Sequence, residues 1–154
     1  MSMENSDQVD IYTIGFTKKG ANRFFELLRD ANITKLVDTR INNRSQLSGF
    51  AKRDDLIFFL DEILDAEYVH DTDLAPTKNL LDEWRNDKIS WNSYEERFRE
   101  LMVEREIETK LDKSTFTDPT VLLCSEHKPD HCHRRLIVEY LDDTWGNVNA
   151  IHLS

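Results

Sequence analysis

The chain has 154 residues, 39% of them hydrophobic and 10% aromatic, which is enough for the core of one domain and too short for a multidomain protein. Thirty acidic residues against twenty basic ones give a formal net charge of −10. Nonspecific binding to nucleic acid depends on many contacts between cationic side chains and phosphate groups. A chain with this negative charge is therefore not expected to bind nucleic acid over an extended surface.

The first half of the chain alternates strand and helix patterns. Residues 1–10 are polar and acidic and lack both the basic start and the apolar stretch of a secretion signal, so we expect a soluble, cytoplasmic protein. Short β-branched runs predict strands, and apolar residues three and four positions apart predict helices. The expected elements are a strand at 11–14, a helix at 21–31, a strand at 35–38, a helix at 56–64 and a strand at 67–70.

The second half continues the alternation. The run at 120–124 is the clearest strand, because four consecutive β-branched or apolar residues need burial on both faces of a sheet. No apolar run reaches the length of about 18 residues that a membrane span requires, so no membrane contact is expected. The expected elements are a short helix that can begin at Thr77, a helix at 91–102, a strand at 120–124, a helix from about His131 and a strand at 148–153.

Strands that alternate with helices require crossover connections, and these build a mostly parallel sheet. We therefore predict a single three-layer α/β domain over residues 11–154, with about five strands and helices on both faces. Residues 1–10 are expected to form a loosely held polar tail. Four glycines and three prolines leave little room for flexible linkers.

Chemically capable side chains follow the predicted strands. In a parallel sheet all carboxyl ends lie at one edge, and ligands bind in the crevice beyond it. We expect Thr17, Asp38, Arg40, His70 and Glu126 to meet there, because each stands at or just beyond a predicted strand end. The plainer residues at the opposite edge support this assignment.

The densest cluster of reactive side chains lies between residues 124 and 135. Asp130 is the expected N-cap of the last helix, which places Cys132 and His133 in the first helical turn. The amides and dipole of that turn stabilise a thiolate or a bound anion. Arg134 adds a bidentate donor for phosphate or carboxylate.

Two alternatives stay open for this cluster. Cys132 can be a small buried packing residue, and Arg134 can pair with Asp38 or Glu126. A second basic stretch could clamp an anion, and it consists of Arg40, Arg44, Lys52 and Arg53.

The two cysteines, Cys124 and Cys132, are expected to be reduced thiols in a cytosol, because nothing else in the chain is typical of a small secreted disulfide scaffold. No second pair of ligands gives them the spacing of a zinc site, so we assign no metal. The chain has neither G-x-G-x-x-G nor G-x-x-x-x-G-K-[ST], which excludes a nucleotide bound through a glycine fingerprint. No cofactor is assigned.

Six separated motifs resemble one known family, the domain of unknown function 488, in the right order from about Ile11 to Leu153. The resemblance implies an α/β fold and no particular reaction. Phe16 departs from the family, in which many members have histidine, and this argues against a general base at that position. The motifs are Tyr12-Thr-Ile-Gly-Phe-Thr17, Val37-Asp-Thr-Arg40, Gly49-Phe50, Tyr68-Val-His70 with Leu74-Ala-Pro76, Leu122-Leu-Cys-Ser-Glu126 and Cys132-His-Arg134. The shared site that the resemblance implies contains Asp38, Arg40, His70, Glu126, Cys132, His133 and Arg134.

Two functional hypotheses follow. In the first, the protein is an enzyme acting on a small anionic or nucleotide-like substrate. In the second, it is a binding module for a phosphate-bearing ligand or a nucleic-acid end, and no bond is broken. Neither names a protein partner. The catalytic candidates are Cys132, Glu126, His70 and Asp38. The substrate-binding candidates are Arg40, Arg44, His133, Arg134 and Thr17.

Overall fold

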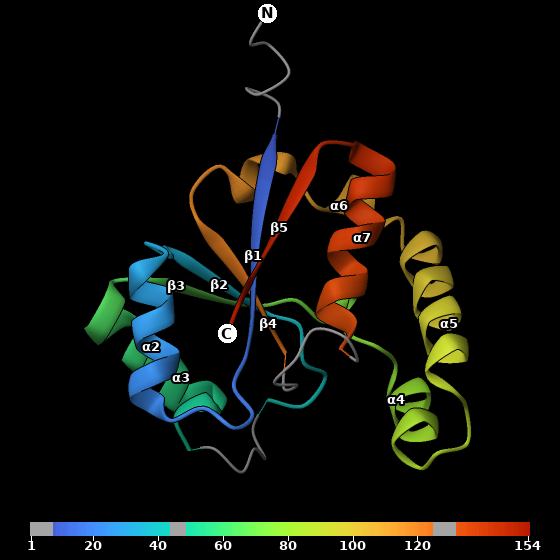
Figure 1. The fold of residues 1–154 in the computed structure, drawn as a ribbon, viewed down its shortest axis with the longest axis horizontal. Helices are drawn as coiled ribbons and strands as arrows, with labels where there is room; N and C mark the ends of the chain where they lie inside the picture. The colour runs from blue at the N-terminus through green and yellow to red at the C-terminus, as the bar shows by residue number, and fades with distance from the viewer. Residues whose placement is uncertain (1–7, 44–48, 125–131) are drawn as a thin grey trace, which may run out of the picture.

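The computed structural model describes residues 8–43, 49–124 and 132–154, and within these ranges five strands form one parallel sheet (Figure 1). The predicted single α/β domain is confirmed. The strand order across the sheet is β3-β2-β4-β1-β5. The strands are β1 Val9–Gly15, β2 Lys35–Asp38, β3 Glu67–His70, β4 Thr120–Cys124 and β5 Val148–Leu153.

Helices cover both faces of the sheet, as the alternating pattern predicts. A π-helical turn, Leu60–Leu64, continues α3. The first face carries α2 Ala21–Asp30 and α3 Arg53–Phe59, and the second carries α4 Lys78–Arg85, α5 Trp91–Glu104, α6 Ile107–Lys110 and α7 His133–Trp145. None of the helices in the described ranges is long and apolar enough to cross a membrane.

The division of the helices follows from the strand order. The connections from β1 to β2 and from β2 to β3 run toward one edge of the sheet, and those from β3 to β4 and from β4 to β5 run toward the other. Because parallel crossovers are right-handed, opposite directions place their helices on opposite faces. The helices that follow the neighbouring strands β2 and β4 thus lie on different faces of the sheet. In parallel α/β sheets, ligands bind beyond the strand ends at such a position.

An apolar core fills the space on each face. On the first face α2 contributes Phe24, Phe25 and Leu28, and on the second α5 contributes Tyr94 and other buried side chains. All five residues of β4 are buried, as the apolar run predicts. Burying one large apolar side chain stabilises a fold by about 1.5–3 kcal/mol, so these faces hold the strands rigidly in register.

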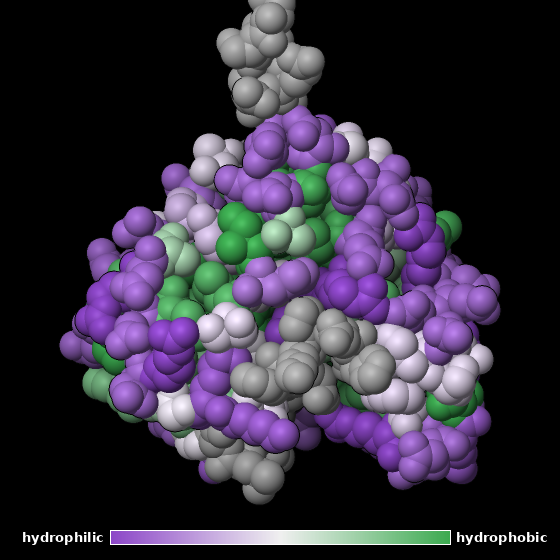
Figure 2. Space-filling view, viewed as in Figure 1, coloured by the Kyte–Doolittle hydropathy of each residue, from purple (hydrophilic) through white to green (hydrophobic). Residues whose placement is uncertain are grey.

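Hydrophilic residues cover most of the face seen in Figure 2, and hydrophobic residues are visible where β1 and β5 lie between α2 and α7. This distribution agrees with the acidic composition.

Several elements differ from the predictions, and helix α3 begins at Arg53 where the pattern predicted a start at residue 56. β1 begins at Val9, because this buried residue pairs with Val148 of β5. Helix α6 was not expected, and it is separated from α5 by the left-handed backbone of Glu106, with φ 54°. Helix α7 begins at His133, because Cys132 has extended backbone angles and is its N-cap. The expected N-cap, Asp130, lies outside the described residues.

Candidate functional site

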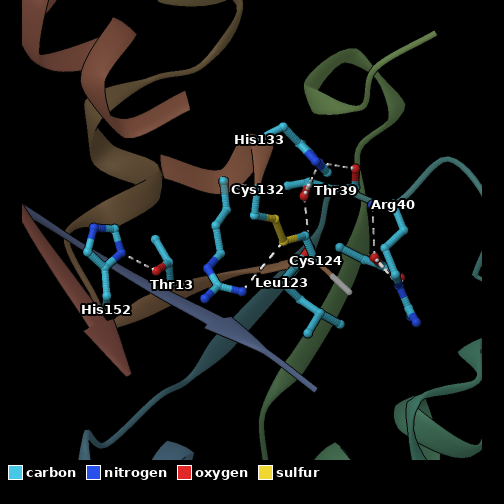
Figure 3. The surroundings of a disulfide bond; sticks show 10 residues. Thr13, Thr39, Arg40, Leu123, Cys124, Cys132, His133 and His152 are labelled. Atoms are coloured by element: carbon cyan, nitrogen blue, oxygen red, sulfur yellow. Dashed lines mark hydrogen bonds and ion pairs between the residues drawn. A yellow bond between two sulfur atoms is a disulfide. The ribbon is translucent and has the colours of Figure 1, made fainter. Parts of the chain in front are cut away.

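The carboxyl ends of β2, β3 and β4 meet at one edge of the sheet. Asp38 stands opposite His70 on β3 and opposite Leu123 on β4 in the strand register. Cys124 ends β4, and α7 begins with His133 close to that end (Figure 3). The sheet therefore brings together chain segments that are separated by up to about ninety residues.

Asp38 and Arg40 form a buried ion pair with both carboxylate oxygens engaged. Arg40 Nε donates to Asp38 Oδ1 and Nη2 donates to Oδ2, each at 2.8 Å, and the two residues are 0% and 3% exposed. Tyr68 donates its hydroxyl to Asp38 Oδ2 at 2.5 Å. Burial alone would raise the pKa of Asp38, but Arg40 and the Tyr68 hydroxyl outweigh it and hold the pKa below its usual value. The alternative pairing of Asp38 with Arg134 is wrong.

Tyr68 links this pair to a further polar side chain. Its hydroxyl accepts a hydrogen bond from Asn43 Nδ2 at 2.8 Å while it donates to Asp38. Burial, and then the hydrogen bond to the Asp38 carboxylate, raises the pKa of Tyr68 far above its ordinary value, so the hydroxyl stays protonated. The relay runs from the Asn43 amide through the hydroxyl to the carboxylate.

We expect Tyr68→Phe to lower the free energy of unfolding by about 1–3 kcal/mol, because it removes one of the two hydrogen bonds to Asp38 Oδ2 and leaves a donor on Asn43 without a partner. Urea unfolding followed by circular dichroism measures the change. Tyr12→Phe is the matched control, with an expected change below about 0.5 kcal/mol. Equal losses in the two variants would show that the hydroxyl relay contributes nothing specific.

Arg40 retains one buried nitrogen, Nη1, for which the described residues provide no hydrogen-bond partner. Its guanidinium carbon lies 5.4 Å from the centre of the Phe16 ring, which follows β1. Phe16 thus contributes an aromatic face for the cation at the position where the family often has histidine. The guanidinium reaches from the end of β2 across to the end of β1.

His70 is one of the residues that line a cavity of about 660 Å³. Its Nε2 is 2.7 Å from the backbone carbonyl oxygen of Arg40 and must carry the hydrogen, since a carbonyl can only accept. In the neutral ring, Nδ1 therefore keeps the lone pair that a general base needs. The other residues that line the cavity are Ile41, Asn42, Asn43, Arg53, Ile57 and Tyr68.

His133, the first residue of α7, is buried against the end of β2. Its Nε2 lies 2.9 Å from both the carbonyl oxygen and the hydroxyl of Thr39, and that hydroxyl donates to the carbonyl oxygen of Leu123 at 2.8 Å. Burial lowers the pKa of His133 from 6.5 to about 4. The imidazole is therefore neutral at pH 7, donates through Nε2 and fixes α7 against β2.

Cys124 and Cys132 form a disulfide bond (Figure 3), and the expectation of two reduced thiols is wrong. The bond joins the last residue of β4 to the N-cap of α7, and both residues are buried. Arg134 Nη1 donates to Cys124 Sγ at 3.5 Å. The arginine thus contacts Cys124, whereas the sequence predicted a thiolate at Cys132.

One group of described residues has the donor types of a metal site. Donor atoms of Cys124, Cys132 and His133 lie within 4.8 Å of one another. A metal ion takes thiolates, and in this state the two sulfurs are bonded to each other. In this structure two of the three donors are joined in a disulfide, so the group lacks the thiolates that would bind a metal ion.

Most of the predicted site residues lie at this one edge. The predicted residues at this edge are Asp38, Arg40, His70, Cys132, His133 and Arg134. Thr17 follows β1 at the same edge and is half-buried. Glu126 and Arg44 lie outside the described residues. Sequence reasoning did not assign Tyr68, Asn43 or Thr39 to the site, although Tyr68 and Thr39 stand within the family motifs. Tyr68 resembles any core aromatic in a strand, and only its hydroxyl contact with Asp38 distinguishes it.

The comparisons with known proteins give one match. Residues 20–141 match the family described as Domain of unknown function DUF488, a range that is narrower than the motifs suggested but covers well over half of the chain. No curated protein and no solved structure matches the chain. The chain therefore belongs to the DUF488 family, which confirms the resemblance found in its motifs.

Proposed function

We propose that this protein binds a small anionic ligand in the crevice beyond the carboxyl ends of β2, β3 and β4, and that it acts on this ligand as an enzyme. Arg40 and Arg134 supply guanidinium N–H groups, and the parallel sheet supplies the crevice. Phosphate and carboxylate are the groups that guanidinium recognises best. The candidate ligands are accordingly phosphate, a nucleotide or another small phosphate-bearing compound.

The observation that carries this proposal is the buried Nη1 of Arg40. Asp38 fixes the guanidinium by two hydrogen bonds at its other nitrogens, and the described residues leave Nη1 without an acceptor. A buried donor without a partner costs about 1–3 kcal/mol, so an oxygen of a ligand would be bound favourably there. The side chain is also rigid before binding, which reduces the entropy lost on binding.

His70 is the proposed proton-transfer group. It lines the cavity, its ring is oriented by the Arg40 carbonyl, and its Nδ1 carries a lone pair when the ring is neutral. Asp38 is a positioning residue, because both of its oxygens are engaged by Arg40 and Tyr68. Cys132 is bonded to Cys124 and cannot serve as a nucleophile in this state.

The second candidate function is a binding module without catalysis. Its support is that Asp38 and Cys132 are both committed to contacts within the protein. The two candidates differ in one measurable result. An enzyme converts the compound that stabilises it, whereas a module releases the same compound unchanged.

Inorganic phosphate and nucleoside monophosphates are expected to raise the melting temperature of the chain, with about 2.7 kcal/mol of stabilisation at one hundred times the dissociation constant. Arg40→Lys keeps a cation beside Asp38 but loses the planar guanidinium, so we expect at least about tenfold weaker binding. Differential scanning fluorimetry and calorimetric titration measure both effects.

Arg99→Gln is the matched control, because Arg99 pairs with Asp143 on the exposed surface. It should bind the anions like the unmodified chain. Equal binding by the Arg40→Lys variant, or no stabilisation by any of these anions, would refute the proposal. For a compound that binds, His70→Gln should preserve affinity and abolish conversion.

A further inference from the structure

The disulfide between Cys124 and Cys132 lies in a positively charged environment. Arg134, with 0% of its surface exposed, donates to Cys124 Sγ, and both residues sit at the edge where β4 meets α7. Burial and then the positive charge of Arg134 lower the pKa of Lys19, which follows β1, so this lysine also stands near the guanidinium. A full cationic charge is thus held directly against a sulfur atom that is neutral in the disulfide.

Two other ionisable groups among the described residues lie at this edge of the sheet. Asp38 is neutralised by Arg40 in the buried ion pair. His133 is neutral at pH 7 and donates to Thr39. A guanidinium bonds more strongly to a thiolate than to a neutral sulfur, so Arg134 stabilises the reduced, ionised form of this cysteine.

We propose that Cys124 and Cys132 are a redox-active dithiol–disulfide pair that exchanges with small thiols and disulfides of the glutathione class. Cys132 is the sulfur that the incoming thiolate attacks, and Cys124 is the leaving group. Cys132 is the more exposed of the two, with 3% against 0%, and it is the N-cap of α7. A leaving thiolate that is stabilised by Arg134 departs faster.

The exchange balances in two steps. In the first, a thiolate of the reductant bonds to Cys132 Sγ, the bond between Cys124 and Cys132 breaks, and its electron pair stays on Cys124 as a thiolate beside Arg134. In the second, another reductant thiolate attacks the reductant sulfur of the mixed disulfide and releases Cys132, which takes up a proton. Two small thiols become one disulfide, the protein pair gains two electrons, and one proton passes to the solvent.

The same sulfurs do not favour a cation. A divalent metal at Cys124 would lie close to the Arg134 guanidinium, and two positive charges at that separation repel. His133 uses its Nε2 on Thr39, so only its Nδ1 could serve as a ligand atom. The surroundings of the two sulfurs thus favour a dithiol over a metal centre. The second test below includes metal binding by the reduced chain as a result that would contradict the proposal.

The first test measures thiolate formation in single-cysteine variants by ultraviolet absorbance as the pH rises. Cys132→Ser leaves Cys124 alone beside Arg134, and Cys124→Ser leaves Cys132 alone. We expect half-ionisation of Cys124 at least about one pH unit below that of Cys132. This readout needs no reagent to enter the protein. Ionisation of Cys124 at the same pH as Cys132, or at a higher pH, would overturn the proposal.

The second test follows reduction of the folded chain by glutathione, with alkylation of the products and intact-mass analysis. The unmodified chain should pass through a mixed disulfide, and Arg134→Gln should slow reduction by roughly tenfold. Arg135→Gln is the control, since Arg135 binds Glu95 and Glu139 on the outer side of α7, and it should leave the rate unchanged. If Arg134→Gln does not fold, the absorbance test decides by itself. Reduction only after unfolding, equal rates in both variants, or a stoichiometric metal ion retained by the reduced chain would each overturn the proposal.

Discussion

Asp38→Ala is expected to lower the free energy of unfolding by about 3–5 kcal/mol, the largest loss expected for any single substitution at the site. The substitution leaves the buried Arg40 guanidinium without its counter-charge and removes the acceptor of the Tyr68 hydroxyl. The pKa of Asp38 is lowered in the folded chain, so its stabilisation is present above the ordinary aspartate pKa and is lost as the pH falls through the folded value.

Urea unfolding near neutral pH measures this loss. Asp143→Ala is the matched control, because it breaks an aspartate–arginine pair at the exposed surface and should cost about 0–1 kcal/mol. A double variant, Asp38→Leu with Arg40→Met, removes both charges and should recover most of the stability. If Asp38→Ala and Asp143→Ala cost the same, the buried pair has no special role.

The free energy of unfolding is also expected to fall as the pH decreases below neutrality, and His133 should account for much of this. The pKa of His133 is about 4 in the folded chain because burial opposes its charge, whereas the unfolded chain takes up the proton near 6.5. Between these values the unfolded state binds more protons, so stability present at neutral pH is lost on acidification. The expected loss from this residue between about pH 7.5 and about pH 5 is about 2 kcal/mol.

His133→Gln tests this, since a glutamine can donate to Thr39 and does not titrate. The variant should be less stable near neutral pH and should lose about 2 kcal/mol less than the unmodified chain over the same interval. Parallel pH profiles for the unmodified chain and His133→Gln would contradict the burial of a neutral imidazole.

Local periodicity accounts for the elements that sequence reasoning placed correctly. The continuous apolar run of β4 had to be a strand buried on both faces, and all five of its residues are buried. Strands that alternate with helices required a parallel sheet, and that sheet by itself brings Asp38 and His70 to the same edge. These results depend only on the chemistry of neighbouring residues and on the handedness of crossovers.

The partner of each polar group could not be predicted from the sequence, because it depends on which strands are neighbours and on where each helix starts. Asp38 had two arginines within conceivable reach, and it binds Arg40 because the backbone after β2 turns that side chain back onto the carboxylate. Two cysteines eight residues apart could not be assigned a bond from spacing. Only the start of α7 beside the end of β4 brings their sulfurs together.

The sequence by itself determined the α/β class, the edge of the sheet at which the reactive side chains gather and the family. The tertiary structure decided the bonding within that edge: the Asp38–Arg40–Tyr68 network, the neutral His133 and the disulfide beside Arg134. The physical reason is the separation along the chain over which each kind of interaction acts. Periodicity and strand direction act over a few residues, whereas hydrogen bonds, ionisation and sulfur contacts depend on distances of about 3 Å between segments far apart in the chain.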